Sequence, residues 1–316
     1  MDQPDKIYRY QKFSALSIGA LCHDQLYFSE PRSFNDPLDC QPSVESDSNI
    51  DRLRLVLTTQ IQQRVEAEIL SSLTKAKVTG ENSIKHAKEI AKQIAENELL
   101  DIKYNAKDPE RESSYFDNEC WLLTCEIERE LLKKYDRGIC CFTSNKYNPL
   151  LWSHYGDQHR GFCAGYDLNR KPKPDLHKVI YNGNRIVHTN LIAKAIIEED
   201  LEYQKRLDEN VLLRKAEPWS YEDEWRLFGK SGIQDSVLAL KDITFGLRCT
   251  DAVRHSVIAS LENRGDGINF YQIYQTRGTF DLEERLIDTK EPSSLPHTAC
   301  SGFEVFGHLL EIPSEL

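Results

Sequence analysis

The residues most suggestive of chemistry lie in the run WSYEDEWRLF, which extends from Trp219 to Phe228. Read as a strand, this run places Glu222, Glu224 and Arg226 on one face, because side chains alternate between the two faces of a strand. Two carboxylates that point the same way repel each other, so we expect at least one of the two glutamates to have a raised pKa. Such a pair is typical either of a solvated sheet edge, where Arg226 partly neutralises it, or of a functional site.

Three further positions carry groups that could bind a ligand. Arg9 lies in the strand-like segment KIYRY, and arginine stays charged and binds phosphate through two hydrogen bonds. Thr143 and Ser144 end the segment ICCFTS, where a hydroxyl could orient a carboxylate, and the ring of Phe142 could stack on a planar ligand. Structural interpretations remain open as well, because Arg9 could be a surface charge and the hydroxyls could end a strand before the turn NKYNP.

The segment FNDP is typical of a turn, since Asn35 and Asp36 can bond to nearby backbone and Pro37 fixes the next φ angle. We favour a structural turn there, although Asn35 or Asp36 could also line a pocket rim. His154 and His159 are five residues apart and do not share a helix face, so we expect no metal site. The defining turns of serine hydrolases and of phosphate-binding loops are absent from the sequence.

The composition limits the class of protein. The chain has 316 residues, of which 40% are hydrophobic and 29% charged, as in ordinary globular proteins. A net charge of −11 argues against non-specific binding of nucleic acid. Nine cysteines, an odd number, indicate reduced, mostly buried thiols. No apolar stretch is long enough to span a membrane and the N-terminus lacks a secretory pattern, so we expect a cytoplasmic protein with no membrane partner.

The hydrophobic periodicity predicts a single α+β domain over residues 1–316, with a helical insertion at residues 49–134. Within the insertion we expect three amphipathic helices that pack against one another and against one edge of the sheet. Further helices are expected at 191–215 and 251–261, and a helix or turn at 16–22. Strands are expected at 6–10, 25–28, 139–144, 161–167, 178–182, 219–228, 243–247 and 269–276.

A family resemblance follows from five ordered motifs: IYRY, LYFSEPRSFNDPLD, CCFTSN, LLWSHYGDQHRGFCAGYD and WSYEDEWRL. This series resembles a bacterial family catalogued as domain of unknown function 2971, whose name carries no function. The order of residues is also similar to that of ADP-ribosyltransferases, which present an Arg or His on a first strand, an aromatic residue with Ser or Thr on a second, and Glu-x-Glu on a later one. The second motif departs from that pattern, because Phe142 stands where those enzymes have Ser.

The resemblance implies an ADP-ribosyltransferase-like mixed sheet that binds NAD. Glu224 would then stabilise the positive charge that develops on the ribose, and Glu222 would accept a proton from the incoming nucleophile. The NAD-binding residues implied by the resemblance are Arg9, Tyr10, Asn35, Phe142, Thr143, Ser144 and Tyr155.

The function implied is that of a toxin or phage-defence effector, which transfers ADP-ribose to a protein or nucleic acid and has an antitoxin as a further partner. Two alternatives remain open. One is a non-catalytic module of the same fold that binds a ligand or partner, and the other, less favoured, is a metal nuclease using Asp36, Asp39 and His154. Finding Arg9 and Glu224 in one cleft would favour the enzyme over the module.

Overall fold

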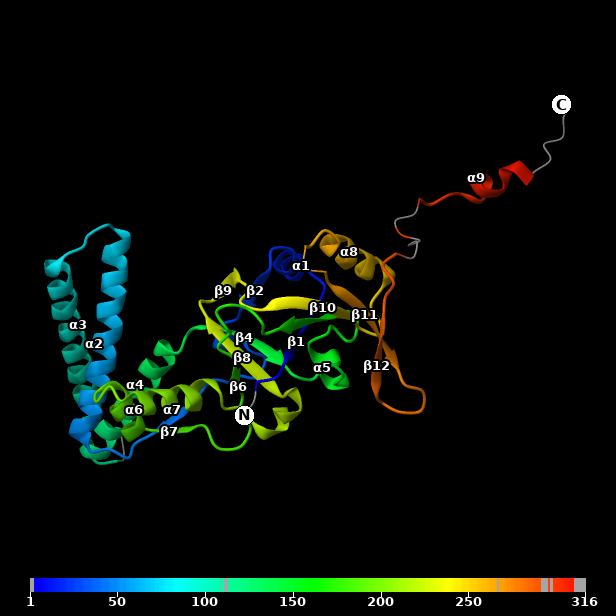
Figure 1. The fold of residues 1–316 in the computed structure, drawn as a ribbon. Coiled ribbons are helices and arrows are strands. Elements are labelled where there is room, and N and C mark those ends of the chain that lie inside the picture. Colours follow the sequence, from blue (N-terminus) through cyan, green and yellow to red (C-terminus); the bar gives the residue numbers. More distant parts are fainter. Residues whose placement is uncertain are drawn as a thin grey trace, which may run out of the picture. The chain divides into compact units, whose positions relative to one another are not determined.

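The computed structural model describes residues 3–108, 110, 113–265, 267–290, 295 and 298–309 (Figure 1). The chain divides into two compact units. The first unit comprises the described residues of Met1–Pro4, Leu26–Asn145 and Lys171–Val237. The second comprises those of Asp5–Gln25, Lys146–Arg170 and Leu238–Leu316. The expected single domain over 1–316 with an insertion at 49–134 stays a prediction.

Three long helices dominate the first unit: α2 (Ile50–Lys75), α3 (Glu81–Asn105) and α4 (Tyr115–Lys134). They pack against one another, which confirms the three amphipathic helices predicted from the periodicity. The Asn49 side chain caps α2 by accepting a hydrogen bond from the backbone N–H of Arg52. Gly80 precedes α3 with φ of 130°, a conformation that favours glycine.

The strands that position the site also belong to the first unit. β4 (Gly138–Thr143) pairs antiparallel with β8 (Glu224–Gly229), and β6 (His177–Lys178) pairs antiparallel with β8. The remaining elements are β2 (Gln25–Phe28), which begins at the unit boundary, η1 (Pro31–Ser33), β3 (Ser43–Glu45), β7 (Ile186–His188), α6 (Thr189–Ile196), α7 (Leu201–Leu212), η2 (Glu217–Glu222) and β9 (Gly232–Asp235).

Three sequence predictions for this unit are wrong in detail. The run 219–228 is not one strand, because η2 covers its first part and β8 begins only at Glu224. The helix expected over 191–215 is two helices, since the Asp200 side chain caps a new start for α7. The strand expected at 178–182 is shorter and begins one residue earlier, because β6 covers only His177–Lys178.

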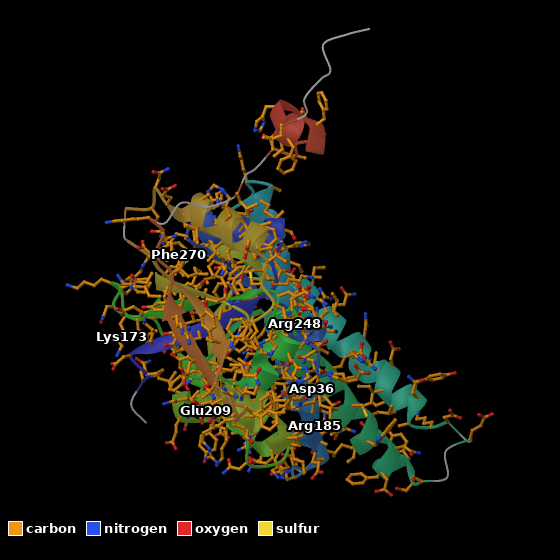
Figure 2. The ribbon with its side chains drawn as sticks, turned by 90° about the vertical axis from the view of Figure 1, so that its right-hand side faces the viewer. Asp36, Lys173, Arg185, Glu209, Arg248 and Phe270 are labelled. Atoms are coloured by element: carbon orange, nitrogen blue, oxygen red, sulfur yellow. The ribbon has the colours of Figure 1, made fainter. Side chains whose placement is uncertain are left out.

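Among the described residues of the second unit, five strands lie in the order β12-β11-β10-β5-β1. Neighbouring strands are antiparallel, except that β10 and β11 are parallel. Phe270, labelled in Figure 2, stacks on Phe245 with ring centroids 6.4 Å apart. The elements are β1 (Lys6–Gln11), α1 (Ala15–Cys22), α5 (Pro149–His154), β5 (Phe162–Asp167), β10 (Ala239–Phe245), α8 (Asp251–Leu261), β11 (Asn269–Gln275), β12 (Leu282–Leu286), α9 (Gly302–Phe306) and η3 (Gly307–Leu309).

Each unit therefore combines helices with mostly antiparallel strands, in agreement with the predicted mixture of α and β structure. All nine cysteines are free thiols; Cys140 and Cys163 are buried, whereas Cys22 and Cys300 are exposed. In the described part of the chain, no helix has the length and apolar character needed to cross a membrane.

Candidate functional site

Five charged side chains of the first unit meet in what we call the Glu224 cluster: Asp39, Lys215, Glu222, Glu224 and Arg226. None of these side chains is more than 5% exposed. Strand alternation in β8 places Glu224 and Arg226 on the same face. Asp39 comes from the turn-rich segment after η1, and Lys215 from the short link between α7 and η2.

The backbone at Asp223 brings the two glutamates together. Asp223 adopts the left-handed conformation with φ of 40° and ψ of 55°, so the chain turns sharply between η2 and β8. As a result the Oε2 atoms of Glu222 and Glu224 lie 2.5 and 2.8 Å from the Nζ of Lys215. The Asp223 carboxylate accepts a hydrogen bond from the Ser144 hydroxyl and pairs with Lys178, which holds the strained turn in place.

Arg226 is the most deeply buried member of the cluster, with a side chain that is 0% exposed. Its Nε donates to Glu224 Oε1 at 2.7 Å and its Nη2 to Asp39 Oδ2 at 2.7 Å. Its Nη1 donates to the carbonyl oxygen of Leu212 at 2.7 Å and to the Cys40 sulfur at 3.0 Å. The guanidinium thus uses its fork geometry to join β8 to two other segments of the unit.

The electrostatics of the cluster keep Glu224 ionised. Burial alone would raise the pKa of Glu224, but the nearby charges of Arg226 and Lys215 outweigh it and lower this pKa to about 2. Burial would likewise lower the pKa of Lys215 and Arg226, but the surrounding carboxylates raise both. The pKa of Glu224 is therefore lowered, whereas repulsion by Glu222 alone would raise it. The difference arises because Arg226 and Lys215 both contact the Glu224 carboxylate.

Both interpretations of the acidic run can now be compared with its burial. Glu222 is 4% and Glu224 2% exposed, so the solvated sheet edge is wrong. The two carboxyl groups do share one buried cluster, as the alternative required. At formal charges, the three acidic and two basic side chains joined by these contacts carry a net charge of −1.

Two of the predicted NAD-binding residues lie on β4, beside Glu224. Thr143 is directly opposite Glu224 in the β4–β8 register, so their side chains share a face. The Thr143 hydroxyl accepts a hydrogen bond from the backbone N–H of Asn145 at 2.9 Å. Phe142 pairs with Trp225 on the opposite face and is only 3% exposed. The predicted stacking of Phe142 on a ligand stays a prediction.

Ser144 and Asn35 contribute to turns of the first unit. Ser144 donates to Asp223 instead of orienting Glu224. Asn35 is exposed, and its neighbour Asp36, labelled in Figure 2, accepts a hydrogen bond from the backbone N–H of Leu38 at 2.9 Å. The favoured interpretation of FNDP as a structural turn is confirmed.

The other predicted residues, Arg9, Tyr10 and Tyr155, belong to the second unit. Arg9 is half-buried on β1, opposite Ala164 of β5. Tyr10 is a core residue, and burial raises the pKa of its hydroxyl. Its ring packs edge-on against that of Trp152, with the ring centroids 4.9 Å apart. Tyr155 is half-buried at the end of α5. That Arg9 and Glu224 act in one cleft stays a prediction.

Sequence reasoning missed two members of the cluster and one neighbour. The sequence suggests Asp39 only as a metal ligand, and no motif points to Lys215. Tyr181 was also missed, although its hydroxyl accepts a hydrogen bond from the backbone N–H of Glu224 at 2.8 Å. A signal existed, because an acidic run that is to be buried needs more cations than Arg226 supplies. Within the described ranges, no group of three His, Cys, Asp or Glu side chains is arranged to hold a metal ion.

Comparison with known proteins supports one part of the resemblance. Residues 151–227 match the sequence model of a family described as "Protein of unknown function (DUF2971)", which confirms the predicted family over this segment. The segment includes Lys215, Glu222, Glu224 and Arg226 of the cluster. No curated protein and no solved structure matches the chain.

Proposed function

We propose that the protein is a cytoplasmic, NAD-dependent ADP-ribosyltransferase-like enzyme in which Glu224 is the fixed carboxylate of the reaction. The observation that carries this proposal is the charge of the Glu224 cluster. Its formal charge is −1, and the low pKa of Glu224 keeps that carboxylate ionised at neutral pH. The nicotinamide ring of NAD carries one positive charge, which passes to the ribose as the glycosidic bond breaks. The negative net charge of the Glu224 cluster therefore has the sign that attracts this substrate.

The cluster residues divide the chemistry between them. Glu224 stabilises the positive charge on the ribose while the bond to nicotinamide breaks and its electron pair remains on the ring nitrogen. Glu222 accepts the proton of the acceptor nucleophile as that nucleophile forms its new bond to the ribose carbon. Thr143, on the same face as Glu224, offers a hydroxyl to a ribose oxygen. Lys215 and Arg226 position Glu224 and keep it ionised.

The ADP-ribosyltransferase-like fold, the macromolecular acceptor and the role as a toxin or phage-defence effector with an antitoxin belong to the same proposal. They rest on the ordered motifs, in particular on the positions of Arg9, Thr143 and the Glu222/Glu224 pair. Arg9 is proposed to bind the pyrophosphate of NAD, because arginine binds phosphate through two hydrogen bonds.

A non-catalytic binding module is the second candidate, and one observation favours it. The carboxylate of Glu224 contacts two buried cations and is only 2% exposed, as expected of a cluster that serves stability alone. In that case Glu224 would affect unfolding but no reaction of NAD.

The deciding experiment measures NAD consumption and ADP-ribose transfer by the full chain, with cell lysate as the acceptor source. We expect Glu224→Gln to lower turnover by roughly 10²-fold or more, because the charge that stabilises the transition state is lost. The matched control is Glu217→Gln, which makes the same change at an exposed position of η2 and should leave turnover unchanged. Arg9→Ala should instead weaken NAD binding.

Mass spectrometry of protein and nucleic acid from the same reactions identifies the acceptor class. Because Glu224→Gln also affects stability, the variants are compared at a temperature where circular dichroism shows both folded. The absence of NAD turnover by the wild type, together with no thermal shift on addition of NAD, would refute the transferase and leave the binding module.

A further inference from the structure

The loop end of the α2–α3 hairpin differs in charge from the rest of the protein. We call residues 69–95 the arm end. This segment holds five lysines and two glutamates, a net charge of +3, in a chain whose total is −11. The remaining residues therefore carry −14, so the arm end is a local region of opposite sign.

The lysines of the arm end also differ from the arginines nearer the start of α2. Each arginine of α2 pairs with a glutamate of the same unit at 2.6 Å: Arg52 with Glu198, Arg54 with Glu119 and Arg64 with Glu130. Four exposed lysines of the arm end make no ion pair with any described residue: Lys75, Lys77, Lys85 and Lys88. The positive charges there are thus available to a partner.

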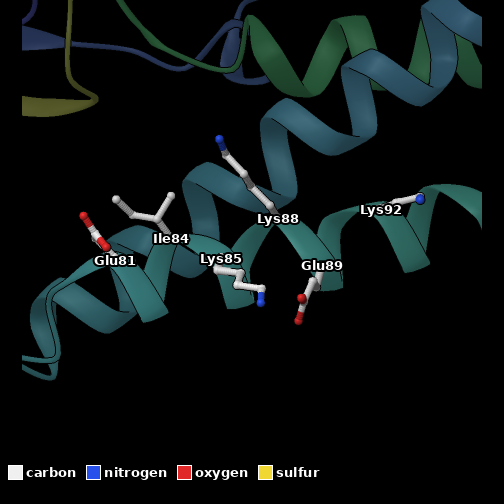
Figure 3. A pocket seen from close by; sticks show the side chains of 6 residues that line it. All are labelled: Glu81, Ile84, Lys85, Lys88, Glu89 and Lys92. Carbon is white, nitrogen blue, oxygen red and sulfur yellow. The ribbon is translucent and has the colours of Figure 1, made fainter.

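A shallow hollow of about 400 Å³ lies on α3 within the arm end (Figure 3). Its lining consists of Glu81, Ile84, Lys85, Lys88, Glu89 and Lys92. Carbon dominates this lining, because the lysines contribute their aliphatic stems and Ile84 is 45% exposed. Lys85, Lys88 and Lys92 are spaced three and four apart on α3, and together with Glu81 and Glu89 they give the lining a formal net charge of +1.

The loop side of the arm end lies beyond the buried part of α2. No residue of α2 beyond Val65 is buried, and the helix continues to Lys75, about 15 Å further along its axis. Figure 1 shows the loop end of the hairpin away from the other elements of this unit. Since charges are screened over about 8 Å at physiological ionic strength, a partner at the loop side of the arm end meets mainly Lys75, Lys77, Lys85 and Lys88, whereas Lys92 lies 3.8 Å from Glu96.

We propose that the arm end binds an acidic segment of a partner protein, which places an apolar side chain in the hollow and carboxylates against Lys85, Lys88 and Lys92. The composition favours protein over nucleic acid, because residues 69–95 contain no arginine and no Phe, Tyr or Trp for bidentate or stacking contacts. It also disfavours a lipid surface, since the small-residue face of α3 is already buried. This inference does not depend on the proposed enzymatic activity.

The test uses the full chain and a fluorescent 20-residue helical peptide composed of Glu and Leu, with fluorescence anisotropy at 50 and 150 mM NaCl. We expect Lys85→Gln, Lys88→Gln and Lys92→Gln together to weaken binding about tenfold, since three exposed ion pairs are lost. The matched control replaces Lys107, Lys173 and Lys205 with Gln, which changes the net charge equally at other exposed positions. This control should bind within about twofold of the wild type.

Ile84→Ser tests the apolar part and should weaken binding at both salt concentrations. Equal effects of the arm-end and control triple variants, or no peptide binding by the wild type, would overturn the proposal. Two parallel titrations, with a labelled 20-nucleotide DNA and with phosphatidylglycerol vesicles, cover other partners. If the wild type binds the DNA or the vesicles but not the peptide, and the arm-end triple variant loses that binding, the proposal is overturned in favour of nucleic acid or lipid. Self-association in sedimentation velocity that the same variant abolishes would assign the surface to a second copy.

Discussion

Replacement of Glu224 with glutamine removes one charge from the cluster while keeping the size of the side chain. Because the folded pKa of Glu224 is about 2, against an ordinary value of 4.5, the ionised carboxylate stabilises the folded state by about 3 kcal/mol at neutral pH. The folded pKa lies below the unfolded one, so this contribution is complete above pH 4.5 and is lost as the pH falls to 2. We therefore expect Glu224→Gln to be about 3 kcal/mol less stable at pH 7.

The assay is urea unfolding of both proteins between pH 7 and pH 3, followed by tryptophan fluorescence; Trp219 and Trp225 lie in the same unit as Glu224. The difference in unfolding free energy should stay constant down to about pH 5 and then shrink by about 1.4 kcal/mol per pH unit. A difference that is independent of pH, or a variant as stable as the wild type at pH 7, would refute the argument that Arg226 and Lys215 hold Glu224 ionised.

Three further predictions concern parts of the first unit. Arg226→Met should lower the free energy of unfolding in urea by about 3–5 kcal/mol, because it leaves buried carboxylates without their partner. Arg226→Lys should recover only part of this loss, because an ammonium group lacks the planar guanidinium that bonds Asp39 and Glu224 together. Asp223→Val should lower the free energy of unfolding by about 1–3 kcal/mol, because a β-branched residue is strained at φ of 40°. Asp223→Asn should lower it less, because asparagine tolerates that conformation, and thermal unfolding measures both. Ala91→Leu should destabilise the α2–α3 packing by about 1–3 kcal/mol, while Gln93→Leu on the exposed side should change the melting of the helical circular dichroism signal little.

The three helices of residues 49–134 were predictable because their determinants are local. Apolar residues recur at three and four positions, Asn49 supplies an N-cap and Gly80 permits the turn before α3. The break between α6 and α7 had a local signal too, since Asp200 is a favourable N-cap inside a run of three acidic residues. The continuous apolar pattern over 191–215 favours one helix, whereas the cap at Asp200 divides it into α6 and α7.

The Glu224 cluster was only partly predictable, because its contacts are distant in sequence. Arg226 and Asp39 are 187 positions apart, and no periodicity relates a turn near the N-terminus to a strand near residue 226. Strand alternation correctly placed Glu224 and Arg226 on one face. It could not anticipate the left-handed Asp223, since a short polar residue tolerates that conformation without requiring it.

Burial and reactivity at Glu224 are compatible if one of its present contacts can be exchanged. Arg226 lies within β8 and is bonded to Asp39 and to the Leu212 carbonyl, so the strand fixes it in place. Lys215 instead reaches the cluster from the link between two helices, through a flexible four-carbon stem. A cationic nicotinamide riboside that displaced the Lys215 ammonium would exchange one positive charge for another and leave the formal charge balance of the cluster unchanged. The same carboxylate would then stabilise the folded protein through Lys215 and the reacting ribose through its own charge, so the NAD assay and the pH dependence of unfolding are measured on the same Glu224 variant.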